Sequence, residues 1–110
     1  MKNYLSEFIG TSFLLMIVVG SGIMGQNLSN DNSIILLANT VATGSGLIIL
    51  IWMMGPISGA HFNPAVSMIF YFKKQLSGKD FVGYSSSQIL GALCGTVSYT
   101  HLTLPTTEAV

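Results

Sequence analysis

Arginine is absent from this sequence, and charged residues of every kind are scarce. Only 7% of the 110 residues are charged, the four cations are all lysines, and the formal net charge is zero. Soluble domains average about 25% charged residues, and a nucleic-acid-binding surface needs a basic patch that is missing here. Half of the residues are hydrophobic. The composition therefore indicates a protein whose main solvent is the lipid bilayer.

Cysteine and histidine are equally rare. The single cysteine, Cys94, excludes an internal disulfide and says nothing about the redox compartment. His61, His101 and Cys94 lack the spacing of metal ligands, so we expect no metal and no other cofactor. The four acidic residues are scattered and form no pair for acid–base chemistry. We therefore expect that the protein is not an enzyme.

The gaps between charged residues are long enough for membrane spans. A helix needs about 20 apolar residues to cross a bilayer. Residues 8–30 and residues 81–107 are uncharged, and each stretch fits one span. Residues 32–72 are also uncharged, but they are too many for one straight crossing and are interrupted by Gly55 and Pro56, which we expect to end a helix. The sequence predicts spanning helices at 4–24, 33–54 and 81–99.

A signal peptide is the alternative interpretation of the first span. Lys2 precedes the apolar run, as in the basic start of such a peptide. No typical cleavage site follows, however, and Glu7 stands at the start of the apolar region. A spanning helix is the interpretation that we favour.

The lysines predict the topology, because cationic residues near span ends accumulate on the cytoplasmic side. Lys2 precedes the first span, and Lys73, Lys74 and Lys79 precede the third. With the N-terminus inside, the second span also returns the chain to the inside. Residues 57–72 must then begin and end on that side. We predict that this segment enters the membrane and turns back.

The join between Asn63 and Pro64 carries the chemistry of this segment. Asn caps the start of a helix, and Pro suits the first helical position. A helix over residues 64–72 would reach about half-way across the hydrocarbon. Irregular backbone at residues 58–62 is tolerated at that depth where it lines a water-filled cavity, with carbonyls that accept and an Asn63 amide that donates. The alternative is an ordinary helix start on a cytoplasmic loop.

Several segments resemble one family of channels. Residues 58–67 are similar to the first signature loop of the aquaporins and glycerol facilitators, the major intrinsic proteins. Residues 7–11 resemble the family's opening helix, and residues 88–92 its third helix. Residues 18–25 and 37–44 are more similar to bacterial members associated with metalloid solutes than to strict water channels.

The resemblance implies a fold and a set of roles. The fold is an all-α transmembrane one, with three spanning helices and one re-entrant half-helix, as in the first of two inverted repeats. The resemblance makes Asn63 the central hydrogen-bond donor of the pore. The signature tripeptide is Asn63, Pro64 and Ala65, and the acceptor carbonyls belong to Gly59, Ala60 and His61.

Two further roles follow from the resemblance. Glu7 would brace the re-entrant loop by accepting hydrogen bonds, although it could instead reach the cytoplasmic interface. Thr43 occupies a filter position that is often aromatic in the family, and its smaller side chain would admit solutes larger than water. It could instead face another helix. His61 could also be a packed histidine that uses only its carbonyl in the pore.

The resemblance covers roughly residues 4–97, and we assign residues 1–97 to the first repeat. The second repeat and its filter arginine are missing. We expect residues 98–110 to be a foreign tail, and the chain to be half of a passive channel for water, glycerol or metalloid acids. It would not conduct alone. A full-length homotetramer in the cell membrane, with a cytoplasmic N-terminus, is the implied assembly. The alternatives are a non-conducting three-span membrane protein and a truncated product without function.

Overall fold

The structure, a computed structural model, describes the backbone of residues 2–109 and the side chains of residues 2–98. Side chains of the predicted tail thus lie almost wholly outside the described residues. Over the described backbone the chain is helical and contains no strand, so the predicted all-α class is confirmed. The helices are α1 (Lys2–Leu28), α2 (Asn32–Ser58), α3 (Pro64–Phe72) and α4 (Gly78–Ala109).

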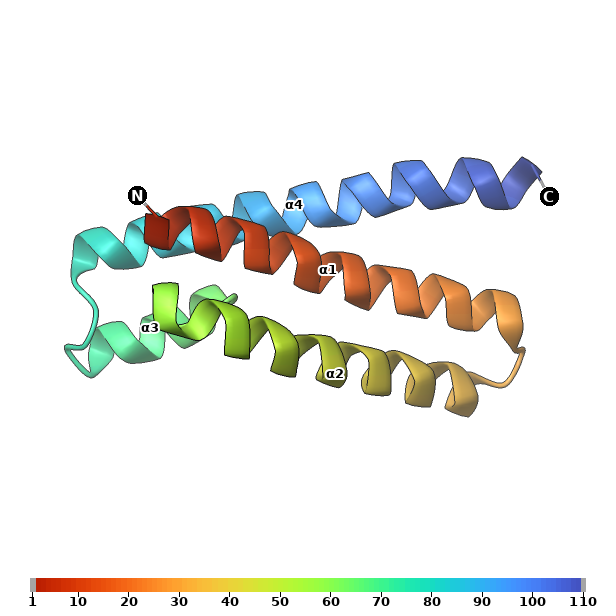
Figure 1. Cartoon of the computed structure of the whole chain (residues 1–110), viewed down its shortest axis with the longest axis horizontal. Helices are drawn as coiled ribbons and strands as arrows, with labels where there is room; N and C mark the ends of the chain where they lie inside the picture. Colours follow the sequence, from red (N-terminus) through yellow and green to blue (C-terminus); the bar gives the residue numbers. More distant parts are fainter. Residues whose placement is uncertain (1, 110) are drawn as a thin grey trace.

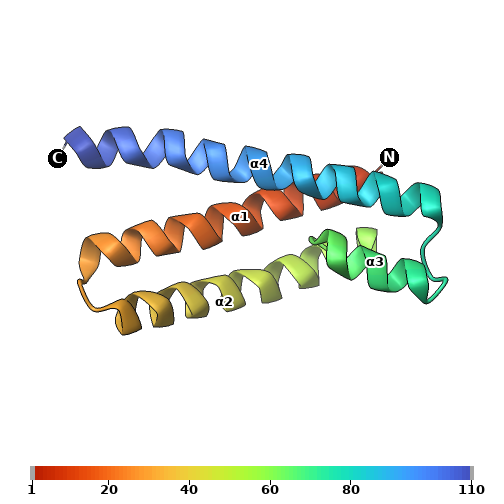
Figure 2. The ribbon, with the colours of Figure 1, turned by 180° about the vertical axis from the view of Figure 1, so that it is seen from behind.

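The helix α1 is the central element of the bundle. It packs against α2 on one side and α4 on the other, and the short α3 packs against α4. Figure 1 shows that α1 and α4 run in the same direction, with α2 antiparallel to both. Figure 2 shows α3 at the same end of the bundle as the C-terminus of α2, and its packing partner there is α4.

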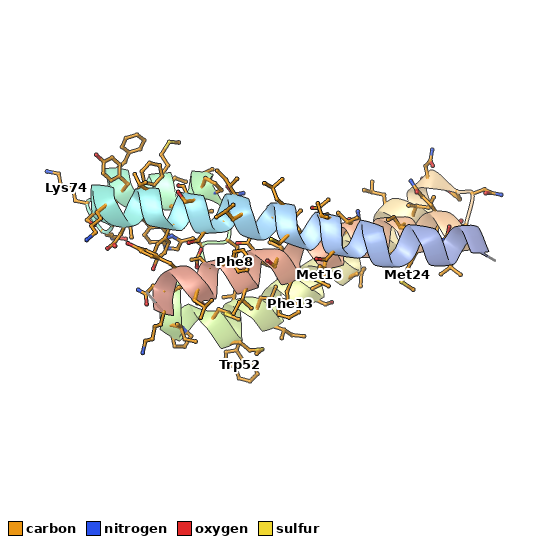
Figure 3. All side chains as sticks on the ribbon, turned by 90° about the horizontal axis from the view of Figure 1, so that it is seen from above. Phe8, Phe13, Met16, Met24, Trp52 and Lys74 are labelled. Carbon is orange, nitrogen blue, oxygen red and sulfur yellow. The ribbon has the colours of Figure 1, made fainter. Side chains whose placement is uncertain are left out.

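The interior is polar and the exterior is apolar, the reverse of a soluble protein. The most deeply buried side chains are polar, whereas Trp52 is 83% exposed and points away from the other helices (Figure 3). Both α1 and α2 are long and apolar enough to cross a membrane, with mean hydropathies of 1.9 and 2.2. The side chains that are less than 2% exposed are Glu7, Thr11, Ser67 and Gln88.

Two glycines bring α1 and α4 into backbone contact. A Cβ atom on Gly91 would lie 2.5 Å from the Phe8 carbonyl oxygen, and one on Gly95 would overlap the Ser12 carbonyl. Small residues at this spacing let membrane helices approach closely. The spacing of Gly91 and Gly95 is thus explained by helix packing. By contrast, nothing lies within 4 Å of a Cβ atom added to Gly44 on α2.

The second helix does not end at Gly55 and Pro56, as the sequence predicts, but continues to Ser58. Proline removes the hydrogen bond that its own N–H would donate one turn back, and its ring crowds the carbonyl group there. The next turn still closes, because the Gly59 N–H donates to the Gly55 carbonyl at 2.8 Å. Gly59 then ends the helix in the left-handed conformation, at φ 87°.

The first and fourth helices are also longer than predicted. The glycines near the end of α1 remain helical to Leu28, and Gly25 packs against Ile35 of α2. The fourth helix begins at Gly78, where the Ser77 hydroxyl accepts from the Asp80 N–H at 3.1 Å. Burial against a neighbour and a local cap thus extend helices beyond the apolar runs that mark them in the sequence.

Candidate functional site

The Glu7 carboxylate is the centre of the polar interior. It is fully buried, and four donors reach its two oxygens. Oε2 accepts from the Ser58 hydroxyl at 2.5 Å and the His61 N–H at 3.2 Å. Oε1 accepts from the Phe62 N–H at 2.8 Å and the Gln88 side-chain amide at 2.6 Å. One side chain of α1 therefore fastens the loop between α2 and α3 to α4.

Ser58 is a second junction of the same network. While its hydroxyl donates to Glu7, the hydroxyl oxygen accepts from Ser6 at 3.2 Å and from the Ala60 N–H at 3.3 Å. Its carbonyl accepts from the Tyr84 hydroxyl of α4 at 2.8 Å. The last residue of α2 is thus held from both neighbouring helices. Its polar groups are satisfied within the protein, as burial requires.

The backbone of the loop is folded so that its donors face inward. Gly59, Ala60 and Phe62 have positive φ angles of 87°, 53° and 56°, an uncommon conformation for the two residues with side chains. The N–H groups of residues 59–62 all donate to groups of the protein. No hydrogen bond from the backbone of residues 2–109 or from the side chains of residues 2–98 reaches the carbonyl oxygens of Gly59, Ala60 or His61. These oxygens are free to accept.

Phe62 anchors the loop with an apolar side chain that the sequence did not single out. It is 4% exposed, and its ring lies against Gly10 of α1, where a Cβ atom would overlap it. Side-chain packing and the Glu7 hydrogen bonds together hold Phe62 in its left-handed backbone conformation. The absence of a side chain at Gly10 is the only local signal of this contact in the sequence.

Asn63 lies at the amide end of α3. Its side-chain oxygen accepts from the Ala65 N–H at 2.8 Å, and Pro64 occupies the first turn. The Asn63 side chain is exposed, and its amide nitrogen has no hydrogen-bond partner in the part of the chain whose side chains the structure describes. The cap therefore uses the acceptor half of the amide and leaves the donor half free.

The His61 ring is packed against α3 and α4. It stacks on Phe70 with ring centroids 4.5 Å apart and planes 7° apart. Its Nδ1 lies 2.9 Å from the hydroxyl of Ser67, which also accepts from the Gln88 amide at 3.1 Å. The His61 ring is thus held by stacking and by its Nδ1 contact, while among the described residues its Nε2 and its carbonyl oxygen have no hydrogen-bond partner. Gln88, Ser67 and Tyr84 are network residues that the sequence analysis did not assign to the site.

Thr43 lies apart from this network, nearer the start of α2. It is half-buried in a groove of about 400 Å³ between α1 and α2, and its hydroxyl donates to the Asn39 side chain at 3.3 Å. The predicted residues therefore form two groups. Glu7, the loop and Asn63 lie together at the end of the bundle that holds the C-terminus of α2. Thr43 lies nearer the other end of α2, away from them. Within the described residues no cluster of three potential metal ligands occurs.

Comparison with known proteins points to one family. The sequence profile of the family described as Major intrinsic protein matches residues 1–109. Aquaglyceroporin AqpS of Rhizobium meliloti (strain 1021) is 47% identical over 95 residues, 86% of this chain and 41% of the relative. The probable glycerol uptake facilitator protein of Thermotoga maritima is 35% identical, over 88% of this chain and 42% of the relative.

A plant relative shows the same partial coverage. Aquaporin NIP1-1 of Arabidopsis thaliana is 34% identical over 92 residues, which is 84% of this chain and 30% of the relative. The chain thus spans about two fifths or less of the length of the curated relatives it matches.

Proposed function

Because this chain belongs to the major intrinsic protein family, we propose that it forms one repeat of a passive transmembrane channel for water and small neutral solutes. The relatives named for glycerol uptake and for aquaglyceroporin activity support a solute such as glycerol. Residues 18–25 and 37–44 favour neutral metalloid acids as a further class. Permeation through a channel requires no bond-breaking, so no catalytic group is assigned.

This proposal rests on the backbone of residues 59–62, in which the N–H groups are hydrogen-bonded within the protein and most of the carbonyl oxygens are not. Their N–H groups are used inside the protein, and three carbonyl oxygens are left without partners among the described residues. Unpaired backbone carbonyls at membrane depth are costly unless water or a solute reaches them. A row of acceptors beside the free Asn63 amide is what a hydrogen-bonding, uncharged solute needs as it sheds water.

In the proposed membrane arrangement α1, α2 and α4 span the bilayer and α3 dips into it. The exposed apolar side chains of α2, of which Trp52 is the most exposed at 83%, suit contact with lipid (Figure 3). Lys2, Lys73, Lys74 and Lys79 would lie on the cytoplasmic side of the cell membrane. The loop network would then be in the cytoplasmic half, with Asn63 near the midplane.

Rejection of cations would come from the direction of α3. Its N-terminus at Asn63 carries the positive end of the helix dipole, and the Asn63 amide adds a donor at the same point. A cation meets repulsion there, whereas a neutral molecule with lone pairs gains a hydrogen bond.

A second repeat would complete the passage from the other side. One half-helix of nine residues reaches about 13.5 Å, roughly half the hydrocarbon. We propose that the whole channel pairs this repeat, residues 1–97, with an inverted copy, and that it assembles as a homotetramer. Thr43 would line the filter of such a channel.

The test is transport by the full-length channel that carries this chain as its first repeat. Proteoliposomes containing it should swell faster in glycerol and shrink faster under an impermeant osmolyte than protein-free liposomes. The same vesicles should show no proton or sodium current. A measurable ion current, or solute rates equal to those of protein-free liposomes, would contradict the proposal.

A further inference from the structure

A polar cluster between α1 and α2 lies outside the loop network. The side-chain oxygen of Asn39 accepts from the Ser21 hydroxyl of α1 at 2.6 Å and from the Thr43 hydroxyl at 3.3 Å. The Ser21 hydroxyl has a single proton, and the Ile17 carbonyl, also 2.6 Å away, competes with Asn39 for it. Asn39 is half-buried, about five helical turns before Ser58 on α2. No contact of the loop network involves it among the described residues.

Hydrogen bonds from two hydroxyls set the orientation of the Asn39 amide. Its side-chain oxygen is the atom that lies toward Ser21, at 2.6 Å, and toward Thr43, at 3.3 Å. The NH₂ group is therefore turned away from both hydroxyls. Among the described groups, the backbone of residues 2–109 and the side chains of residues 2–98, it has no hydrogen-bond partner.

The Asn39 side chain helps to line an open groove of about 400 Å³, together with Val18, Thr40, Thr43 and Gly44. The two threonine hydroxyls of this groove already donate their protons within α2. The Thr43 proton goes to Asn39, and the Thr40 hydroxyl donates to the Leu36 carbonyl at 2.8 Å. Both hydroxyls therefore offer lone pairs to the groove. Asn39 supplies its two donors.

We propose that Asn39 is a solute-binding residue, and that this groove binds small neutral molecules carrying hydroxyl groups on adjacent atoms. Two neighbouring hydroxyl oxygens of such a solute accept from the Asn39 NH₂ group, and a hydroxyl proton is donated to Thr43. Water has a single oxygen and gains less from the pair of donors. The proposal rests on the proposed channel function, because a solute reaches the groove only if the α1–α2 face lines the passage.

The experiment compares glycerol and water permeability in proteoliposomes of the full-length channel. Asn39→Ala removes both donors, and Ser21→Ala keeps the amide but removes one hydroxyl that orients it. Ser45→Ala is the matched control, because Ser45 is on α2, is exposed and does not line the groove. Loss of one or two hydrogen bonds to the solute should lower the glycerol-to-water permeability ratio about threefold to tenfold in Asn39→Ala.

The outcomes separate the two proposals. Ser21→Ala should lower the ratio by a smaller factor, and Ser45→Ala should leave it unchanged. Water permeability serves as the internal measure of folded channel, so a variant that incorporates poorly lowers both rates and not their ratio. If the unmodified channel conducts but Asn39→Ala keeps the ratio of Ser45→Ala, the Asn39 proposal is wrong. If the unmodified channel passes neither molecule, the channel function itself fails.

Discussion

The two polar regions of this molecule use buried hydrogen-bonding groups in opposite ways. Around Glu7, the backbone N–H groups of residues 59–62 all donate within the protein, and three carbonyl oxygens have no partner among the described residues. Around Asn39, the oxygen is consumed by Ser21 and Thr43, and the donors remain free. The first region offers acceptors and the second offers donors. A hydroxylated solute can use both, because each hydroxyl donates and accepts.

The two regions also differ in how firmly they are built. The loop region joins all four helices through Glu7, Ser58 and Gln88, and it contains strained backbone at Ala60 and Phe62. The Asn39 cluster joins only α1 and α2. We therefore expect substitutions in the loop region to affect folding, and substitutions near Asn39 to affect mainly selectivity.

The largest expected effect is that of Glu7→Ala. It removes the acceptor of four donors and leaves the buried His61 and Phe62 N–H groups without partners. We expect a loss of about 3–5 kcal/mol in the free energy of unfolding. Loss of helical circular dichroism with increasing denaturant in detergent micelles measures it. Glu7→Gln keeps one acceptor oxygen and should lose less. A Glu7→Ala variant as stable as the parent would refute the bracing role.

A smaller effect is expected from Gly10→Ala, which tests the packing of the loop anchor. The added Cβ atom overlaps the Phe62 ring, and overpacking of this kind costs about 1–3 kcal/mol. The control is Gly44→Ala, where nothing lies within 4 Å and the change should stabilise the helix by about 0.5–1 kcal/mol. The same unfolding measurement applies. Equal shifts for the two variants would mean that the Phe62 contact has no energetic weight.

The smallest expected effect is that of Tyr84→Phe. It deletes the hydroxyl that donates to the Ser58 carbonyl at 2.8 Å and keeps the ring beside Tyr4 and His61. We expect a loss of about 0.5–1.5 kcal/mol in the free energy of unfolding. Tyr71→Phe is the control, because the Tyr71 ring is exposed and its hydroxyl has no hydrogen bond to any described group. The control should unfold like the parent.

Features set by neighbours in the sequence could be predicted, and features set by distant contacts could not. The start of α3 depends on Asn63 and Pro64 alone, and the predicted bounds of 64–72 coincide with that helix. The close approach of α4 to α1 likewise follows from the four-residue spacing of Gly91 and Gly95, which is visible in the sequence. The hydrogen bonds of Gln88 and Tyr84, by contrast, join residues far apart in the chain. These hydrogen bonds cannot be predicted from any pattern of neighbouring residues.

The same reason explains the errors in helix length and the omission of Asn39. Pro56 argues locally for a helix end, but packing against α1 and the cap at Gly59 carry α2 one turn further. Asn39 appears in the sequence as one polar residue in an apolar span. Its importance depends on Ser21 of another helix, which occupies the amide oxygen and leaves the nitrogen free.

The central claim is that residues 57–72 enter the membrane and line a hydrated passage, and cysteine labelling tests it most directly. In a Cys94→Ala background, the Ala65→Cys, Gln75→Cys and Ile49→Cys variants place thiols beside Asn63, in the α3–α4 loop and on the exposed apolar face of α2. A small water-soluble thiol reagent should label the first two and leave Ile49→Cys unlabelled. A bulky impermeant reagent should label only Gln75→Cys. Labelling of Ala65→Cys by the bulky reagent as fast as Gln75→Cys would place the segment outside the membrane and contradict the account.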